Sequence, residues 1–183
     1  YMLLHLRELR RGLAALEAGD WATADALAAE HVPHWANRLL QLAGVTVTVE
    51  GLENIPRGRA VVFAGNHRSY YDIPLVLTQL DAPHGLVAKQ EVDRLPLVRG
   101  WMRLLHCVFL DRDDPRKAMA SLNEAIELVK KGYSMTIFPE GTRNRGAEGS
   151  LLEFKSGAFR VATKAKAPIV PLAITGSRDI MEN

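Results

Sequence analysis

The segment from residue 65 to 72, GNHRSYYD, places a histidine and an aspartate five positions apart, directly after an apolar run. A carboxylate that bonds one imidazole nitrogen fixes the tautomer and stabilises the imidazolium, which leaves the other nitrogen to take a proton from a hydroxyl. We therefore predict that His67 is a general base and that Asp72 orients it. Taken alone, the segment leaves a polar turn without chemistry as the alternative.

On one helix the two side chains would point about 140° apart, because a turn takes 3.6 residues. His67 must therefore precede the helix that is expected over residues 72–80. Either Ser69 begins that helix through an S-x-x-D capping box, or Asp72 caps it with Pro74 at the second helical position. We expect Ser69 to cap or to hydrogen-bond rather than to act as a nucleophile.

A second polar segment, FPEGTRNR at residues 138–145, leaves an apolar run through a proline and a glycine that allow a tight turn. It presents Glu140, Thr142 and Arg143 together. Backbone amides beside a guanidinium suit a phosphate dianion, because the arginine fork matches two phosphate oxygens at once. The segment predicts a phosphate site, and a surface loop with solvated charges is the alternative.

The elements that must position these residues alternate between strand and helix from residue 45 onward. This alternation favours an α/β fold with a mostly parallel central sheet flanked by helices. Strands are expected at residues 45–51, 59–66, 106–110, 133–138 and 168–174, and helices at 72–80, 115–131 and 156–166.

Polar residues follow four of the expected strands. His67 and Asp72 follow one strand, Arg112 the next, Glu140 the third and Ser177 the last. The carboxyl ends of parallel strands meet at one edge of a sheet, where α/β folds bind ligands. The pattern therefore predicts that these four groups share one site.

The first 44 residues are expected to form a helical segment ahead of a catalytic domain over residues 45–183, whose C-terminus we expect to be truncated. Pro33 is expected to end a second helix, with a third over residues 34–43. The segment either packs on the domain as a hairpin or also touches a membrane surface as an amphipathic element. In the first helix, over residues 2–18, one apolar stripe consists of Met2, Leu6, Leu9, Leu13 and Leu16.

Composition limits the other classes of function. Among 183 residues, 23 Lys and Arg oppose 21 Asp and Glu, and the formal net charge of +2 does not indicate a nucleic acid partner. No apolar run reaches the about 18 residues of a membrane-spanning helix. The single cysteine, Cys107, cannot form an internal disulfide and is expected to be buried. His31 and His34 lack companion ligands, so we predict no metal site.

Four blocks of the sequence resemble, in order and spacing, those of the glycerolipid acyltransferases, and in particular those of bacterial 1-acyl-sn-glycerol-3-phosphate acyltransferases. The likeness runs from about residue 45 to residue 176. In the second block His106 stands where this family usually has a glycine. The blocks are NHRSYYD at residues 66–72, FLDR at 109–112, FPEGTR at 138–143 and IVPLAI at 169–174.

The resemblance implies transfer of a fatty acyl group from acyl-CoA or acyl carrier protein to the hydroxyl of 1-acylglycerol 3-phosphate, which gives phosphatidic acid. It implies no cofactor besides this donor substrate, and a peripheral enzyme at the cytoplasmic face of the cell membrane. His67 would be the general base and Asp72 its partner. The acceptor phosphate and its positioning would fall to Lys89, Arg112, Glu140, Gly141, Thr142 and Arg143.

Other functions stay open at this point. The acceptor can be glycerol 3-phosphate or another lysolipid, the chain can hydrolyse thioesters, or it can bind lipids without turnover. The intact pair of His67 and Asp72 argues against a catalytically silent lipid-binding protein. The sequence has no G-x-S-x-G motif, and Cys107 has no obvious activating pair, so a covalent acyl-enzyme is not expected.

Overall fold

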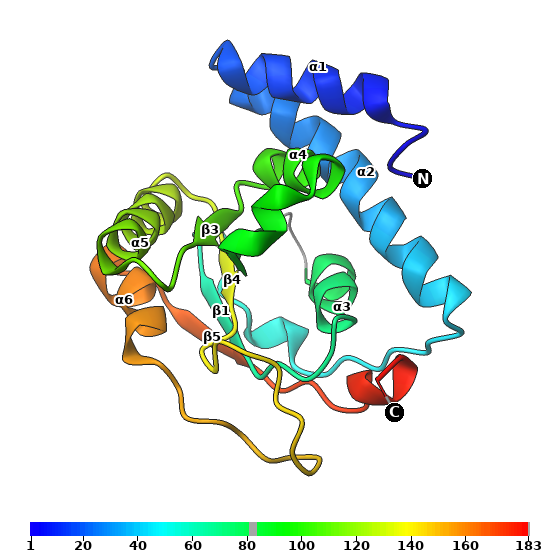
Figure 1. Cartoon of the computed structure of the whole chain (residues 1–183), viewed down its shortest axis with the longest axis vertical. Coiled ribbons are helices and arrows are strands. Elements are labelled where there is room, and N and C mark those ends of the chain that lie inside the picture. Colours follow the sequence, from blue (N-terminus) through cyan, green and yellow to red (C-terminus); the bar gives the residue numbers. More distant parts are fainter. Residues whose placement is uncertain (81–83, 183) are drawn as a thin grey trace.

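The sheet at the centre of the molecule confirms the predicted α/β class. A computed structural model describes residues 1–80 and 84–182. Within these residues five strands lie in the order β3-β2-β4-β1-β5, and every neighbouring pair is parallel (Figure 1). The strands are β1 (Val62–Gly65), β2 (Gly85–Lys89), β3 (Val108–Leu110), β4 (Met135–Ile137) and β5 (Ile169–Leu172).

Helices cover both faces of the sheet and bury a separate apolar cluster on each (Figure 1). The helices α1 to α4 share one cluster, which contains Val76 and Trp101. The other cluster lies under α5 and α6 and contains Val62 and Met135 of the sheet. The helices are α1 (Leu6–Glu17), α2 (Trp21–Leu42), α3 (Asp72–Gln79), α4 (Pro96–Leu104), α5 (Pro115–Lys130) and α6 (Ser156–Ala165), with short turns η1 (Leu52–Asn54), η2 (Gln90–Arg94) and η3 (Ser177–Ile180).

The predicted strand over residues 45–51 is wrong, because this segment pairs with no strand among the described residues. Its alternation still appears in its burial, with Val45 and Val47 half-buried and Thr46 exposed. Alternation of apolar and polar residues indicates that one side of a segment is buried. It does not show that the backbone has a neighbouring strand to pair with. The strand that the sequence did not reveal is β2, which pairs with a neighbour on each side and carries no alternating pattern.

Pro33 does not end a helix as predicted, because α2 runs unbroken from Trp21 to Leu42. A proline in a helix costs about 3 kcal/mol, since it removes a hydrogen bond and its ring clashes with the preceding turn. The His34 imidazole, with Nδ1 2.6 Å from the Glu30 carbonyl oxygen, satisfies one carbonyl of that turn. The apolar residues that α2 buries before and after Pro33 stabilise the helix by more than the proline destabilises it. The buried face consists of Ala28, Val32, Ala36 and Leu40.

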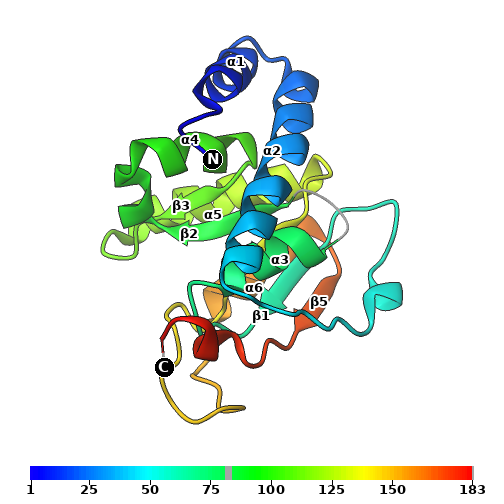
Figure 2. The ribbon, with the colours of Figure 1, turned by 90° about the vertical axis from the view of Figure 1, so that its right-hand side faces the viewer.

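The apolar stripe of α1 packs as predicted against the rest of the molecule. Leu9 is buried, and the other stripe residues lie half-buried on the same cluster that contains residues of α3 and α4. Figure 2 shows α1 above α4, with α2 running beside α3. None of the described helices is both long and apolar enough to cross a membrane.

The histidine in the second block adopts the left-handed backbone conformation, with a φ of 56° at His106. Glycine reaches this region at no steric cost, whereas a residue with a Cβ adopts it at a cost. The side chain offsets the cost, because His106 Nε2 lies 2.6 Å from Asp25 Oδ1 and the ring stacks on Trp21 at 4.9 Å between centroids. Both partners belong to α2, so His106 also fastens that helix to the sheet.

Candidate active site

The predicted histidine and aspartate meet at the carboxyl end of β1. His67 Nδ1 lies 2.7 Å from Asp72 Oδ2, and the ring stacks on Phe138 with 4.3 Å between centroids. The Asp72 side chain is fully buried, whereas that of His67 is 19% exposed. The aspartate therefore holds Nδ1, and Nε2 is the nitrogen that can face a substrate.

Hydrogen bonds from the turn before α3 converge on one carboxylate oxygen of Asp72. Besides His67, the backbone N–H groups of Arg68 and Ser69 donate to Oδ2, at 2.6 and 2.9 Å. Asp72 is the first residue of α3 with Pro74 third, where a missing N–H costs nothing. Ser69 Oγ accepts from the Tyr71 N–H at 3.0 Å, which is a local turn bond. His67 lies outside the helix, as predicted.

Burial alone would raise the pKa of Asp72. Hydrogen bonds from His67, from the Ser177 hydroxyl and from the two backbone amides outweigh this effect, so the pKa lies below its usual 3.8. Ser177 Oγ and Asp72 Oδ1 are buried and have no hydrogen bond of ordinary geometry within the described residues. Since neither has another partner there, we interpret their contact as a weak hydrogen bond that adds to the stabilisation of the carboxylate.

The segment FPEGTRN holds the backbone of His67 from the neighbouring strand. Glu140 is buried, and its Oε1 accepts from the His67 N–H at 2.8 Å while its Oε2 accepts from the Leu152 N–H at 2.8 Å. The Asn144 N–H donates to the His67 carbonyl at 2.7 Å. Because both oxygens of Glu140 are engaged by backbone amides, its place in the site fits positioning better than phosphate contact.

Arg143 lies on the other side of the same turn. Its guanidinium stacks over the Tyr70 ring, with Cζ 3.6 Å from the centroid, and Nη1 lies 3.2 Å from Glu182 Oε1. The side chain is 22% exposed. A stacked guanidinium of this kind is held in one orientation and keeps donors for an anion.

The other predicted ligands lie along the same sheet edge. Arg112 is exposed and its Nη1 donates to the Gly141 carbonyl, which joins the second and third blocks. Gly141 has a φ of 74°, and a Cβ there would meet the Arg112 guanidinium at 3.3 Å. Thr142 is exposed. Lys89, at the end of β2 beside Leu110 in the register, pairs with Glu91 at 2.7 Å.

Sequence reasoning gave no role to Asn66 and Arg68, which stabilise the site from within the first block. Asn66 exchanges two hydrogen bonds with the Ile174 backbone, at 2.8 and 2.7 Å, and so fixes the segment after β5 to the turn. Arg68 is buried and donates to the carbonyls of Ala147 and Gly146 at 2.9 Å each. Their position on either side of His67 is the feature of the sequence that could have identified them. Glu182 had no sequence signal at all.

Cys107 and the two histidines of α2 each have a partner in the structure. Burial raises the pKa of Cys107 to about 12, and its sulfur accepts from the Leu86 N–H at 3.3 Å, so it is no thiolate nucleophile. His31 lies 3.3 Å from the Tyr1 hydroxyl, and His34 bonds the Glu30 carbonyl. Both histidines are therefore engaged in packing or capping.

A groove of about 550 Å³ lies between the segment over residues 43–50, α3 and the chain after β5, and neither His67 nor Asp72 (the dyad) lines it. Ser177 lines this groove and also contacts Asp72, so one residue connects the groove to the dyad. Its volume is typical of a site for an organic ligand. Apolar residues of its wall include Val45, Val47, Leu75, Val76, Leu172 and Ile174.

Known proteins are similar to this chain in sequence and in fold. The family described as Acyltransferase matches residues 46–175. The 1-acyl-sn-glycerol-3-phosphate acyltransferase of Borreliella burgdorferi is 36% identical over 135 residues, which cover 74% of this chain and 53% of the relative. The chloroplastic 1-acyl-sn-glycerol-3-phosphate acyltransferase BAT2 of Brassica napus is 39% identical over 135 residues, which cover 73% and 38%.

A solved structure agrees with the sequence relatives. The crystal structure of the 1-acyl-sn-glycerophosphate acyltransferase PlsC from Thermotoga maritima matches with a TM-score of 0.70 and 30% identity, over 92% of this chain and 72% of that one. The chain spans about half or less of the length of the two curated relatives. The match over residues 46–175 has almost the same limits as the resemblance found in the sequence, which runs from about residue 45 to residue 176. The chain therefore belongs to the glycerolipid acyltransferase family, together with proteins named 1-acyl-sn-glycerol-3-phosphate acyltransferases.

Proposed function

We propose that this chain transfers a fatty acyl group from acyl-CoA or acyl carrier protein to the hydroxyl of 1-acylglycerol 3-phosphate, which gives phosphatidic acid. His67 Nε2 takes the proton of the acceptor hydroxyl, whose oxygen attacks the thioester carbonyl carbon. The new C–O bond forms as the C–S bond breaks. The proton then passes from His67 to the leaving thiolate, so the protein returns to its starting state.

The contact of 2.7 Å between His67 Nδ1 and buried Asp72 Oδ2 is the observation that carries this proposal. An ionised partner raises the basicity of the imidazole and stabilises the imidazolium that forms during transfer. The lowered pKa of Asp72 keeps that partner ionised at neutral pH. The Phe138 ring holds the imidazole from one face.

Two further features support a lipid acceptor that carries phosphate. The Arg143 guanidinium stacks over Tyr70, in the turn between His67 and Asp72, where a phosphate monoester can pair with it. The apolar groove beside Ser177 offers space for an acyl chain. Glycerol 3-phosphate has no such chain, so the groove favours a lysolipid as the acceptor.

An acceptor panel tests the proposal on the purified chain. Thiol release from acyl-CoA is measured with 1-acylglycerol 3-phosphate, glycerol 3-phosphate and lysophosphatidylcholine at matched concentrations. We expect the highest kcat/KM with 1-acylglycerol 3-phosphate. A higher value with another acceptor would change the substrate, equal release without acceptor would indicate a thioesterase, and no release at all would leave a lipid-binding protein.

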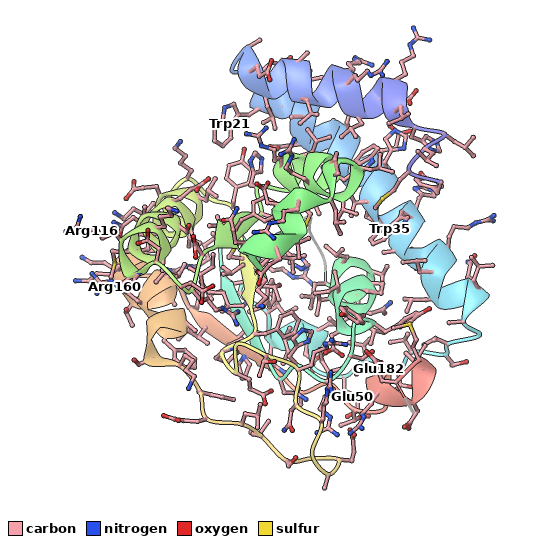
Figure 3. All side chains as sticks on the ribbon, viewed as in Figure 1. Trp21, Trp35, Glu50, Arg116, Arg160 and Glu182 are labelled. Atoms are coloured by element: carbon pink, nitrogen blue, oxygen red, sulfur yellow. The ribbon has the colours of Figure 1, made fainter. Side chains whose placement is uncertain are left out.

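Replacing Arg143 with Ala is expected to lower kcat/KM for 1-acylglycerol 3-phosphate by about 10- to 100-fold, because a charge-assisted hydrogen bond contributes about 1.5–3 kcal/mol. With monoacylglycerol, which lacks the phosphate, the loss should stay below about threefold. The control is Arg160→Ala, since Arg160 is exposed on α6 on the opposite side of the molecule from Glu182 (Figure 3). Equal losses with both acceptors would remove Arg143 from the phosphate site.

We also propose that the chain works on a membrane surface, at the cytoplasmic face of the cell membrane. Leu3 and Leu4 are 70% and 84% exposed in the turn that leads into α1. Arg7, Arg10 and Arg11 are exposed on the same helix. Exposed leucines beside cations suit the boundary between acyl chains and anionic headgroups.

The double substitution Leu3→Glu and Leu4→Glu is expected to reduce binding to anionic vesicles by at least about tenfold, since it replaces two apolar contacts with like charges. The core should be unaffected because both residues are exposed. Sedimentation with phosphatidylglycerol vesicles measures the effect, and Leu42→Glu, exposed at the end of α2, is the matched control. Binding that is unchanged by the double substitution would exclude this surface.

A further inference from the structure

The carboxylate of Glu182 accepts hydrogen bonds from three donors beside His67 and Asp72. Glu182 follows η3 and lies near the loop that leads into α3 (Figure 3). Ser69 Oγ donates to its Oε2 at 2.6 Å. The Tyr70 N–H and Arg143 Nη1 donate to its Oε1 at 3.0 and 3.2 Å. These three donors are named the anion cradle here.

The cradle is preorganised for an anion. Ser69 Oγ accepts from the Tyr71 N–H at 3.0 Å, which directs the hydroxyl proton outward to Glu182. Stacking on the Tyr70 ring fixes the Arg143 guanidinium. A hydroxyl, a backbone N–H and a guanidinium all donate, and together they match the oxygens of a phosphate monoester at least as well as a carboxylate.

The cradle and the base are built on the same residue. The Ser69 side chain belongs to the cradle, while its backbone N–H donates at 2.9 Å to the Asp72 oxygen that holds His67. In 1-acylglycerol 3-phosphate the free hydroxyl and the phosphate ester sit on neighbouring carbons. An acceptor whose phosphate occupies the cradle therefore carries its hydroxyl toward the same turn.

We propose that Ser69 Oγ, the Tyr70 N–H and Arg143 bind the phosphate monoester of the acceptor, and that Glu182 competes for this cradle and leaves it when the acceptor binds. The identity of the acceptor rests on the function proposed above, whereas the competition does not. Burial raises the pKa of Glu182, but hydrogen bonds from Ser69, Tyr70 and Arg143 lower it by more. The competing group is thus ionised at neutral pH.

Titration with inorganic phosphate in the absence of any acyl donor tests the competition. Glu182→Gln and Glu182→Ala are both expected to lower the Kd for phosphate by about 5- to 20-fold, because hydrogen bonds to a charged group no longer have to be broken. Glu124→Gln, on the exposed face of α5, makes the same charge change and should leave the Kd unchanged. Two substitutions are used so that a folding defect in one, detected by its Tm, does not decide the result.

The acceptor is tested separately by kinetics with the full chain. In both variants the KM for 1-acylglycerol 3-phosphate should fall by a factor similar to the Kd for phosphate, while the KM for acyl-CoA stays constant. An unchanged or raised Kd for phosphate would overturn the competition. A lower Kd with an unchanged KM would show that the cradle takes free phosphate rather than the lipid headgroup. If the wild type does not turn over 1-acylglycerol 3-phosphate, the proposed function fails, and the titration still decides whether Glu182 competes.

Discussion

Replacing His67 with Ala is expected to lower kcat/KM for acyl transfer by about 10²- to 10⁴-fold, the range that a positioned general base contributes. The substitution removes the atom that takes the hydroxyl proton but leaves Asp72 with two backbone donors, from Arg68 and Ser69. The turn should therefore keep its shape. Acceptor-dependent thiol release measures the loss, and circular dichroism checks the fold.

The matched control for this experiment is His34→Ala. His34 is an exposed histidine on α2 that bonds only a helix carbonyl among the described residues. Its substitution should change kcat/KM by less than about twofold. If His67→Ala and the control release thiol at the same rate, His67 is not the base.

Asp72→Asn is expected to reduce kcat/KM by about 10²- to 10⁴-fold, because an amide cannot stabilise the imidazolium as a carboxylate does. It should also lower the free energy of unfolding at neutral pH by about 2–4 kcal/mol, since the neutral amide of Asn accepts weaker hydrogen bonds from His67, Arg68 and Ser69 than the fully buried carboxylate does. Asn occupies nearly the same volume, so packing is retained. Urea denaturation and thiol release measure the two effects.

The stability difference has a defined dependence on pH. The folded pKa of Asp72 lies below the ordinary value of 3.8, so its stabilisation is fully present above about pH 4 and is lost as the pH falls through the folded pKa. The wild type and Asp72→Asn should therefore converge in stability as the pH falls below about 4. A difference that grows on acidification would contradict a carboxylate that is ionised in the folded state.

The sequence was sufficient to predict that the dyad and the segment over residues 138–145 lie together. Parallel strands end at one edge, so polar residues that follow β1 and β4 had to meet there, and His67 and Glu140 do so through a 2.8 Å bond. The helix predicted to begin at residue 115 does so, and the Asp114 side chain before it accepts from two backbone amides. Each of these predictions rests on a local rule with a fixed geometry.

Other features depend on contacts between segments far apart in the sequence. Whether Pro33 ends a helix was decided by the burial of the helix face on both sides of it. Whether the alternating residues 45–51 form a strand was decided by the lack of a paired neighbour among the described strands. The partner of Arg143 comes from Glu182, 39 residues later, and no spacing rule connects the two. Such features become visible only once the chain is folded.

The central claim is that an acyl group moves directly from a thioester to the hydroxyl of 1-acylglycerol 3-phosphate. The most direct measurement follows an isotopically labelled acyl group from acyl-CoA by mass spectrometry, in parallel with the thiol released. We expect one labelled phosphatidic acid for each thiol, with no release above background when the acceptor is left out. Labelled free fatty acid at the same rate with and without the acceptor, or thiol release without phosphatidic acid, would contradict it.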